Sequence, residues 1–165
     1  MYDRFELPQY NEIPGVGLFL EQVAKYINEY IVPMGEPELT GSMISNYVKK
    51  DIIDNPIKKQ YGREQIAYLI FIAITKNVLS LEDIGIILNM QKQVCDSQVA
   101  YEYFGEELLA LLSAVFNGEP LPPLKVETDA SKNELKQIVR NVLVTVAHKI
   151  YLDKTFAALK QSDVD

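Results

Sequence analysis

Apolar residues recur at helical spacing through most of the chain, and segments rich in proline and glycine separate the recurrences. Residues 16–32 carry apolar side chains on one helical face and predict a helix, which the prolines and glycine of residues 33–37 end. Residues 42–50 predict a second, short helix, for which Thr40 or Ser42 can supply the capping oxygen. Because so short a helix is not stable alone, we expect it to dock on the first.

A small hairpin is predicted after the short helix. The apolar pair Ile52-Ile53 begins a strand-like segment, which turns at Asn55-Pro56 and returns before Gly62. A hairpin of this size, residues 53–61, is stable only when its apolar side packs against helices. A new helix is predicted to start near Arg63. A short capped helix, a tight basic hairpin and a further helix follow one another in a winged helix-turn-helix, which predicts a protein that holds duplex DNA.

Longer helices are predicted in the remainder of the chain. Ser80 and Asp83 form a capping-box pattern at the start of one of them. Residues 97–116 carry a wide apolar helical face, and residues 117–123 are the best linker candidate. A last helix is predicted from Ser131 to about residue 160, with an apolar stripe broad enough to be buried on two sides.

These elements predict a mainly α-helical protein in two parts. We expect a winged helix-turn-helix domain over residues 1–93 and a helical dimerisation or effector region over residues 94–165. The length of 165 residues and the apolar content of 48% are sufficient for a real core and argue against extensive disorder.

Charge is distributed unevenly along the chain. The net charge is −7, but residues 40–66 carry five basic and three acidic side chains and are the one net-positive segment, at +2. This segment coincides with the predicted helix and hairpin. Because the positive excess is small, we expect weak and salt-sensitive non-specific affinity for DNA.

The polar face of helix 42–50 and the tip of the hairpin supply the candidate DNA contacts. Asn46 can pair with adenine through two hydrogen bonds, Ser45 can donate to a base edge or a phosphate, and the basic side chains can bind phosphates. The alternative is a solvated polar surface. Tyr47 and Tyr61 are instead expected to pack their rings. The predicted DNA-binding residues are Ser42, Ser45, Asn46, Lys49, Lys50, Lys58, Lys59 and Arg63.

No pattern in the chain indicates catalysis, a metal or a cofactor. Cys95 and His148 are the single cysteine and histidine, and neither has the partners that a redox site, a metal site or a triad needs. The acids Glu102, Glu106 and Glu107 are expected to form a solvated helix face. The cluster Tyr101–Phe104 can line a ligand pocket or pack in a core or dimer interface. We therefore expect a protein that is not an enzyme and needs no cofactor.

Residues 40–88 resemble the DNA-binding half of the MerR transcription regulators. That family has a recognition helix with a late Tyr, an apolar pair, a Pro, a basic wing ending in Tyr, and a helix that starts Ser-Leu-Glu-Glu-Ile. The matching residues are Tyr47, Ile52-Ile53, Pro56, Lys58-Lys59, Tyr61 and Ser80–Ile84. MerR regulators usually carry an Arg where this chain has Ser45. That difference and the acidic net charge leave open a second interpretation, a winged-helix module for protein–protein interaction without DNA binding.

The chain also resembles a bacterial family described as domain of unknown function 1836, over most of residues 7–116. The residues that carry this resemblance are Pro14–Val23, Ser42–Val48, Lys59–Tyr61 and Arg63–Leu69. The resemblance implies a regulator and little chemistry.

Partners and location follow from the same observations. One DNA-binding module buries only ~600–1,000 Å² on DNA, so we expect a homodimer, with helix 131–160 as its best interface. An unknown small-molecule or protein effector is a further possible partner. No apolar run reaches the ~18 residues that a membrane span needs, and the charged first residues do not resemble a secretory signal, so we expect a cytoplasmic protein without membrane contact.

Overall fold

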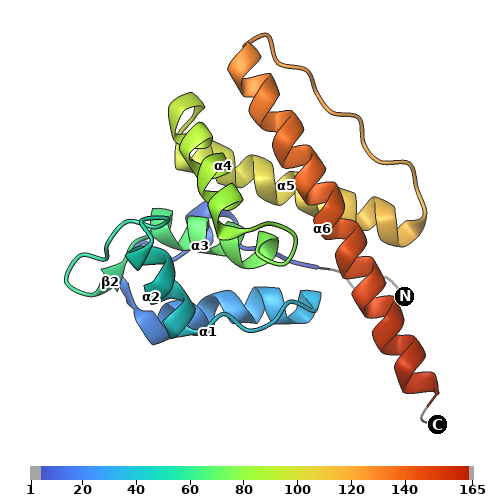
Figure 1. Ribbon diagram of the computed structural model, residues 1–165, viewed down its shortest axis with the longest axis horizontal. Coiled ribbons are helices and arrows are strands. Elements are labelled where there is room, and N and C mark those ends of the chain that lie inside the picture. The colour runs from blue at the N-terminus through green and yellow to red at the C-terminus, as the bar shows by residue number, and fades with distance from the viewer. Residues whose placement is uncertain (1–4, 164–165) are drawn as a thin grey trace.

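The computed structural model describes residues 5–163 and is mainly α-helical, as predicted (Figure 1). Residues 1–4 and 164–165 lie outside this range, although they belong to the two predicted parts 1–93 and 94–165. The helices are α1 (Leu20–Ile31), α2 (Gly41–Lys49), α3 (Arg63–Thr75), α4 (Leu81–Val94), α5 (Ser97–Asn117) and α6 (Ala130–Ser162). Strands β1 (Leu18–Phe19) and β2 (Gln60–Tyr61) form an antiparallel sheet, and 3-10 turns cover Tyr10–Glu12 and Val32–Met34.

The first predicted helix begins four residues later than expected. Residues 16–19 do not belong to it, because Leu18 and Phe19 pair with Tyr61 and Gln60 as a strand. Gly17 in this stretch and Gly15 just before it disfavour a helix. Gly17 also permits the pairing, since a Cβ atom there would lie 2.6 Å from Cβ of Gln60.

Helix α2 is capped and docked as its sequence predicts. The Thr40 side chain accepts a hydrogen bond from the Met43 backbone amide at 3.2 Å, so Thr40 rather than Ser42 is the cap. Asn28 of α1 holds the preceding turn, because its side chain exchanges hydrogen bonds of 2.9 and 2.7 Å with the backbone of Leu39. The buried Ile44 and Tyr47 complete the contact with the core.

The hairpin is shorter than predicted, and its partner strand is different. Ile53 is buried in a bend, and its amide and that of Ile52 both donate to the carbonyl of Tyr47 at the end of α2. Pro56 has no N–H for a ladder. Pairing within the hairpin is therefore limited to Ile57 and Gln60, and β2 pairs instead with β1. We call residues 57–60 the wing tip.

The core is one continuous hydrophobic cluster, and α3 lies at its centre. Every residue of α3 from Leu69 to Thr75 is buried, while α1, α5 and α6 each contact this helix. The cluster extends from Phe5 to Ile150 of α6. The division into residues 1–93 and 94–165 stays a prediction, and the described residues of both parts contribute to this one cluster.

A long extended connection joins α5 to α6 and is fixed at both ends (Figure 1). Gly118 ends α5 in the left-handed conformation, with φ of 68°. Arg140 of α6 donates to Glu107 of α5 and to the carbonyl of Pro122 in the connection. Helix α6 starts slightly earlier than predicted: Asp129, not Ser131, is its cap and accepts from the Lys132 amide at 3.0 Å.

Glu36 gives the stability of the fold a defined pH dependence. Its side chain is 7% exposed, and burial raises the pKa of its carboxyl group although Asn77 donates a hydrogen bond to it. The folded protein therefore holds this proton more tightly than the unfolded chain, so the contribution of Glu36 to stability falls as the pH rises from about 4.5 through the raised pKa.

We expect Glu36→Gln to raise the melting temperature at pH 7.5 and to leave it unchanged near pH 4. The amide has no charge to desolvate and still offers an oxygen to Asn77. Thermal unfolding of both proteins across this pH range tests the prediction, and a difference that does not depend on pH would contradict it.

Candidate nucleic-acid interface

Helix α2 presents one continuous polar face to solvent. Ser42, Ser45, Asn46 and Lys49 are all exposed, and their spacing of three, four and seven residues places them on a single side of the helix. The opposite side is buried through Ile44 and Tyr47. Lys50, directly after α2, is also exposed. The amphipathic pattern thus orients the predicted recognition face outward.

The wing tip is a two-residue turn with a lysine at each central position. Ile57 and Gln60 exchange backbone hydrogen bonds of 3.1 and 3.0 Å. Between them Lys58 and Lys59 have φ of 51° and 65°, in the left-handed region that type I′ turns require. Asn-Gly is the usual pair there, because a residue with a Cβ atom costs about 1–2 kcal/mol in this conformation. The backbone of the wing tip is therefore strained at the two residues that carry its positive charges.

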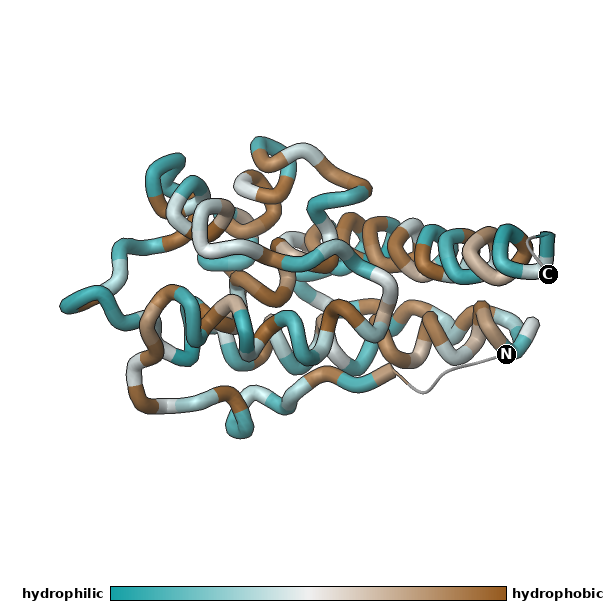
Figure 2. The backbone as a smooth tube through the Cα atoms, turned by 90° about the horizontal axis from the view of Figure 1, so that it is seen from below, coloured by the Kyte–Doolittle hydropathy of each residue, from teal (hydrophilic) through white to brown (hydrophobic). Residues whose placement is uncertain are grey.

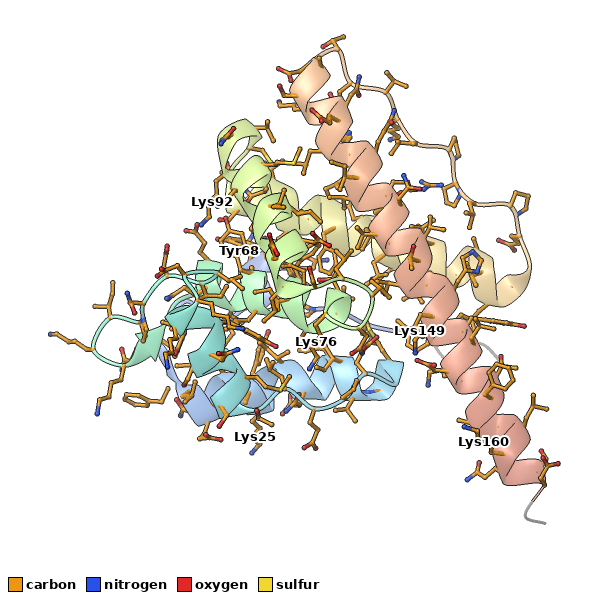
Figure 3. All side chains as sticks on the ribbon, viewed as in Figure 1. Lys25, Tyr68, Lys76, Lys92, Lys149 and Lys160 are labelled. Carbon is orange, nitrogen blue, oxygen red and sulfur yellow. The ribbon has the colours of Figure 1, made fainter. Side chains whose placement is uncertain are left out.

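The basic side chains around α2 and the wing tip are not neutralised by neighbouring acids. Within residues 5–163, Lys49, Lys50, Lys58 and Lys59 form no ion pair. The wing tip projects from the body at the side where α2 is exposed (Figures 1 and 3). Exposed charges held on a projecting element attract a polyanion while water and salt screen them, so any such affinity is salt-dependent.

Arg63 is placed differently from the other predicted contacts. Its Nε donates to the carbonyl of Ile13 at 2.8 Å, and the guanidinium lies 5.8 Å from the centre of the Tyr10 ring. The half-buried side chain thus ties the segment before β1 to the start of α3. Its contact with phosphate stays a prediction. Nothing in the local sequence around Arg63 indicated these partners, which lie about fifty residues away.

Three exposed apolar side chains, which no motif in the sequence indicates, surround the sheet. Ile57 at the wing tip is 78% exposed, and Val16 and Phe19 are 74% and 50% exposed. Helical periodicity predicts a helix over Val16 and Phe19 and therefore does not predict their proximity to the wing tip. The pairing of Phe19 with Gln60 brings them beside the lysines.

The other residues considered in the sequence lie outside this interface, and Tyr101, Tyr103 and Phe104 line a cavity between helices. The rings of Tyr47 and Tyr61 are buried, as predicted, and burial raises the pKa of both hydroxyls. Glu102 and Glu106 are exposed, as expected, whereas Glu107 is half-buried and pairs with Arg140. No group of three or more His, Cys, Asp or Glu side chains within the described part of the chain is arranged to hold a metal ion. Between residues 5 and 163 no helix has both the length and the apolarity to cross a bilayer.

The fold and this surface define a mainly helical protein with an outward-facing polar helix beside a small sheet. The chain belongs to the family described as domain of unknown function 1836, whose model matches residues 8–104, which confirms the resemblance found in the sequence. The match covers α1 to α4 and the first turns of α5, and therefore includes the whole candidate interface. No curated protein and no solved structure matches the chain.

Proposed function

We propose that this protein is a DNA-binding transcriptional regulator with a MerR-like winged helix-turn-helix. Helix α2 enters the major groove and the wing tip contacts the phosphate backbone. The observation that carries the proposal is the pair of strained lysines at the wing tip beside the exposed face of α2. The order of elements along residues 40–88 and the net-positive charge of residues 40–66 support it.

Each exposed side chain has a defined role in this proposal. Asn46 reads adenine, since its amide group both donates and accepts, and Ser45 contacts a base edge or a phosphate. Lys58 and Lys59 neutralise phosphates, together with Lys49 and Lys50 near the end of α2. Phosphate contacts fix the orientation of the protein and the α2 contacts supply sequence preference.

The regulator acts as a homodimer through α6. None of the α6 residues between Ile150 and Ser162 is buried, and this end of α6 extends beyond the other helices (Figure 1). Leu152, Phe156 and Leu159 are 48%, 53% and 54% exposed at a spacing of four and seven residues, which forms one apolar stripe. Hydrophobic positions recur up to the C-terminal end of α6 in Figure 2. A second copy that covers this stripe also supplies the second half-site contact that strong DNA binding needs.

The direct test is a titration of genomic DNA fragments with the full chain at several salt concentrations, read by mobility shift. We expect binding at low salt that weakens steeply as salt rises, and Asn46→Ala to cost roughly 1–3 kcal/mol on the preferred fragment with little effect on non-specific DNA. Absence of salt-sensitive binding at low salt would contradict the proposal.

A protein-interaction module without DNA binding is the second candidate. The exposed Val16, Phe19 and Ile57 favour it, because clustered apolar side chains on a surface are typical of protein contacts. Capture of one stoichiometric protein partner that Phe19→Ser abolishes, together with no DNA binding, would select this candidate. Retained DNA binding by Phe19→Ser would favour the regulator.

A further inference from the structure

A cavity of about 230 Å³ lies between α3, α4, α5 and α6, away from the candidate DNA interface. Its walls are mostly apolar and aromatic. Tyr68 and Phe71 come from α3, Leu88 from α4, Phe104 from α5 and Val139 from α6. Small-molecule sites are concave and apolar with a few polar groups, and they are preferentially found between helices of this kind.

The charged side chains of this cavity are gathered at its α6 side, and their summed charge is net positive. Lys132, Lys136 and Glu127 line it there. Lys136 is paired with Glu127 at 2.5 Å, and its ammonium lies 5.0 Å from the centre of the Tyr103 ring. Lys132 forms no ion pair among residues 5–163. An apolar chamber with one unneutralised cation at its edge is suited to an apolar molecule that carries a negative charge.

This edge of the cavity is held in place before any ligand arrives. The Asn133 side chain exchanges two hydrogen bonds with the backbone of Glu127, which fixes the end of the α5–α6 connection against α6. On the α4 side, Tyr68 donates to Gln91 at 2.7 Å and Gln91 donates to the carbonyl of Cys95 at 2.8 Å. A site with its side chains already ordered loses less conformational entropy on binding.

We propose that this cavity binds a small, largely apolar carboxylate. The hydrocarbon part lies among the aromatic side chains of α3 and α5, and the carboxylate faces Lys132. Such a ligand satisfies both features of the site, since the walls offer burial of apolar surface and Lys132 offers the opposite charge.

The cavity also has a structural connection to the candidate interface. Tyr68 and Phe71 belong to α3, which begins two residues after β2 of the wing. Occupation of the cavity is therefore a route by which the ligand regulates DNA binding. That regulatory step rests on the proposed function, whereas the binding step does not and is measured without DNA.

Cys95 lines the cavity and is the chain's single cysteine, so its alkylation reports occupation in the unmodified protein. Burial raises the pKa of its thiol. We would measure labelling by iodoacetamide at pH 8.5 with increasing 2-naphthoate or with naphthalene-2-carboxamide, which has the same ring system and no charge. We expect 2-naphthoate to slow labelling at least roughly fivefold at saturation, and the amide to need about fivefold higher concentrations, as an exposed ion pair allows.

Three variants test whether 2-naphthoate binds in this cavity or at another surface of the protein. Lys132→Gln should remove the preference for 2-naphthoate over the amide, whereas Lys160→Gln, which alters an exposed lysine elsewhere on α6, should keep it. Ala100→Trp should fill the cavity and abolish 2-naphthoate binding in equilibrium dialysis, with its fold checked by circular dichroism. The proposal is overturned if 2-naphthoate leaves Cys95 labelling unchanged, if the amide protects equally well, or if a folded Ala100→Trp protein still binds 2-naphthoate. If 2-naphthoate protects Cys95 from labelling but does not change DNA binding, the binding site stands and only its regulatory role is overturned.

Discussion

Replacement of Lys58 by Asn and of Lys59 by Gly is expected to weaken DNA binding and, at the same time, to stabilise the folded protein. The two effects have separate causes. Asn-Gly is the pair that a turn with two left-handed residues prefers, so the strain of the wing tip is relieved by about 1–2 kcal/mol. Loss of two phosphate contacts should reduce affinity roughly tenfold or more near 100 mM salt. The slope of log affinity against log salt should fall by about 2.

Mobility-shift titrations at several salt concentrations and denaturant unfolding measure the two effects. The matched control is Lys92→Gln with Lys125→Gln, which removes the same charge from exposed lysines outside both the candidate DNA interface and the α6 stripe. A wing-tip variant that is more stable and binds DNA as well as the unmodified protein would contradict the proposed role of the wing. Because the expected stability change is a gain, weaker DNA binding could not be attributed to unfolding.

The second large effect is expected at the C-terminal end of α6. Phe156→Glu with Leu159→Glu places two negative charges on each copy within the apolar stripe, where they repel one another and cannot be buried. We expect the dimer to dissociate to a folded monomer and DNA affinity to fall by roughly a hundredfold, since a single module contacts only one half-site. Sedimentation equilibrium and mobility shift on the preferred fragment measure these changes.

Asn141→Glu with Thr145→Glu is the control for that experiment. Both residues are exposed on the same side of α6, seven and eleven residues before Leu152, so the control adds the same charge to the same helix two to three turns away from the stripe. It should leave the dimer intact. If the unmodified chain is a monomer at micromolar concentration, or if the stripe variant remains a dimer, α6 is not the interface.

The sequence alone determined the helices and much of the candidate interface because their signals are local. The Thr40 oxygen caps α2 three residues away, and the alternation of Ile44 and Tyr47 with Ser45 and Asn46 decides which face of α2 is exposed. The family match to residues 8–104 rests on the same local residues.

Only the tertiary structure decided the contacts between distant segments. Helical periodicity placed residues 16–19 in a helix, whereas their pairing with Tyr61 and Gln60 depends on a strand more than forty residues away. In the sequence Arg63 resembles a free surface cation, whereas in the folded protein it donates a hydrogen bond to the backbone of Ile13. The cavity likewise requires four helices to pack without filling the space between them. Spacing along a chain encodes hydrogen bonds and faces within one element, but the position of one element against another follows from the packing of all the side chains between them.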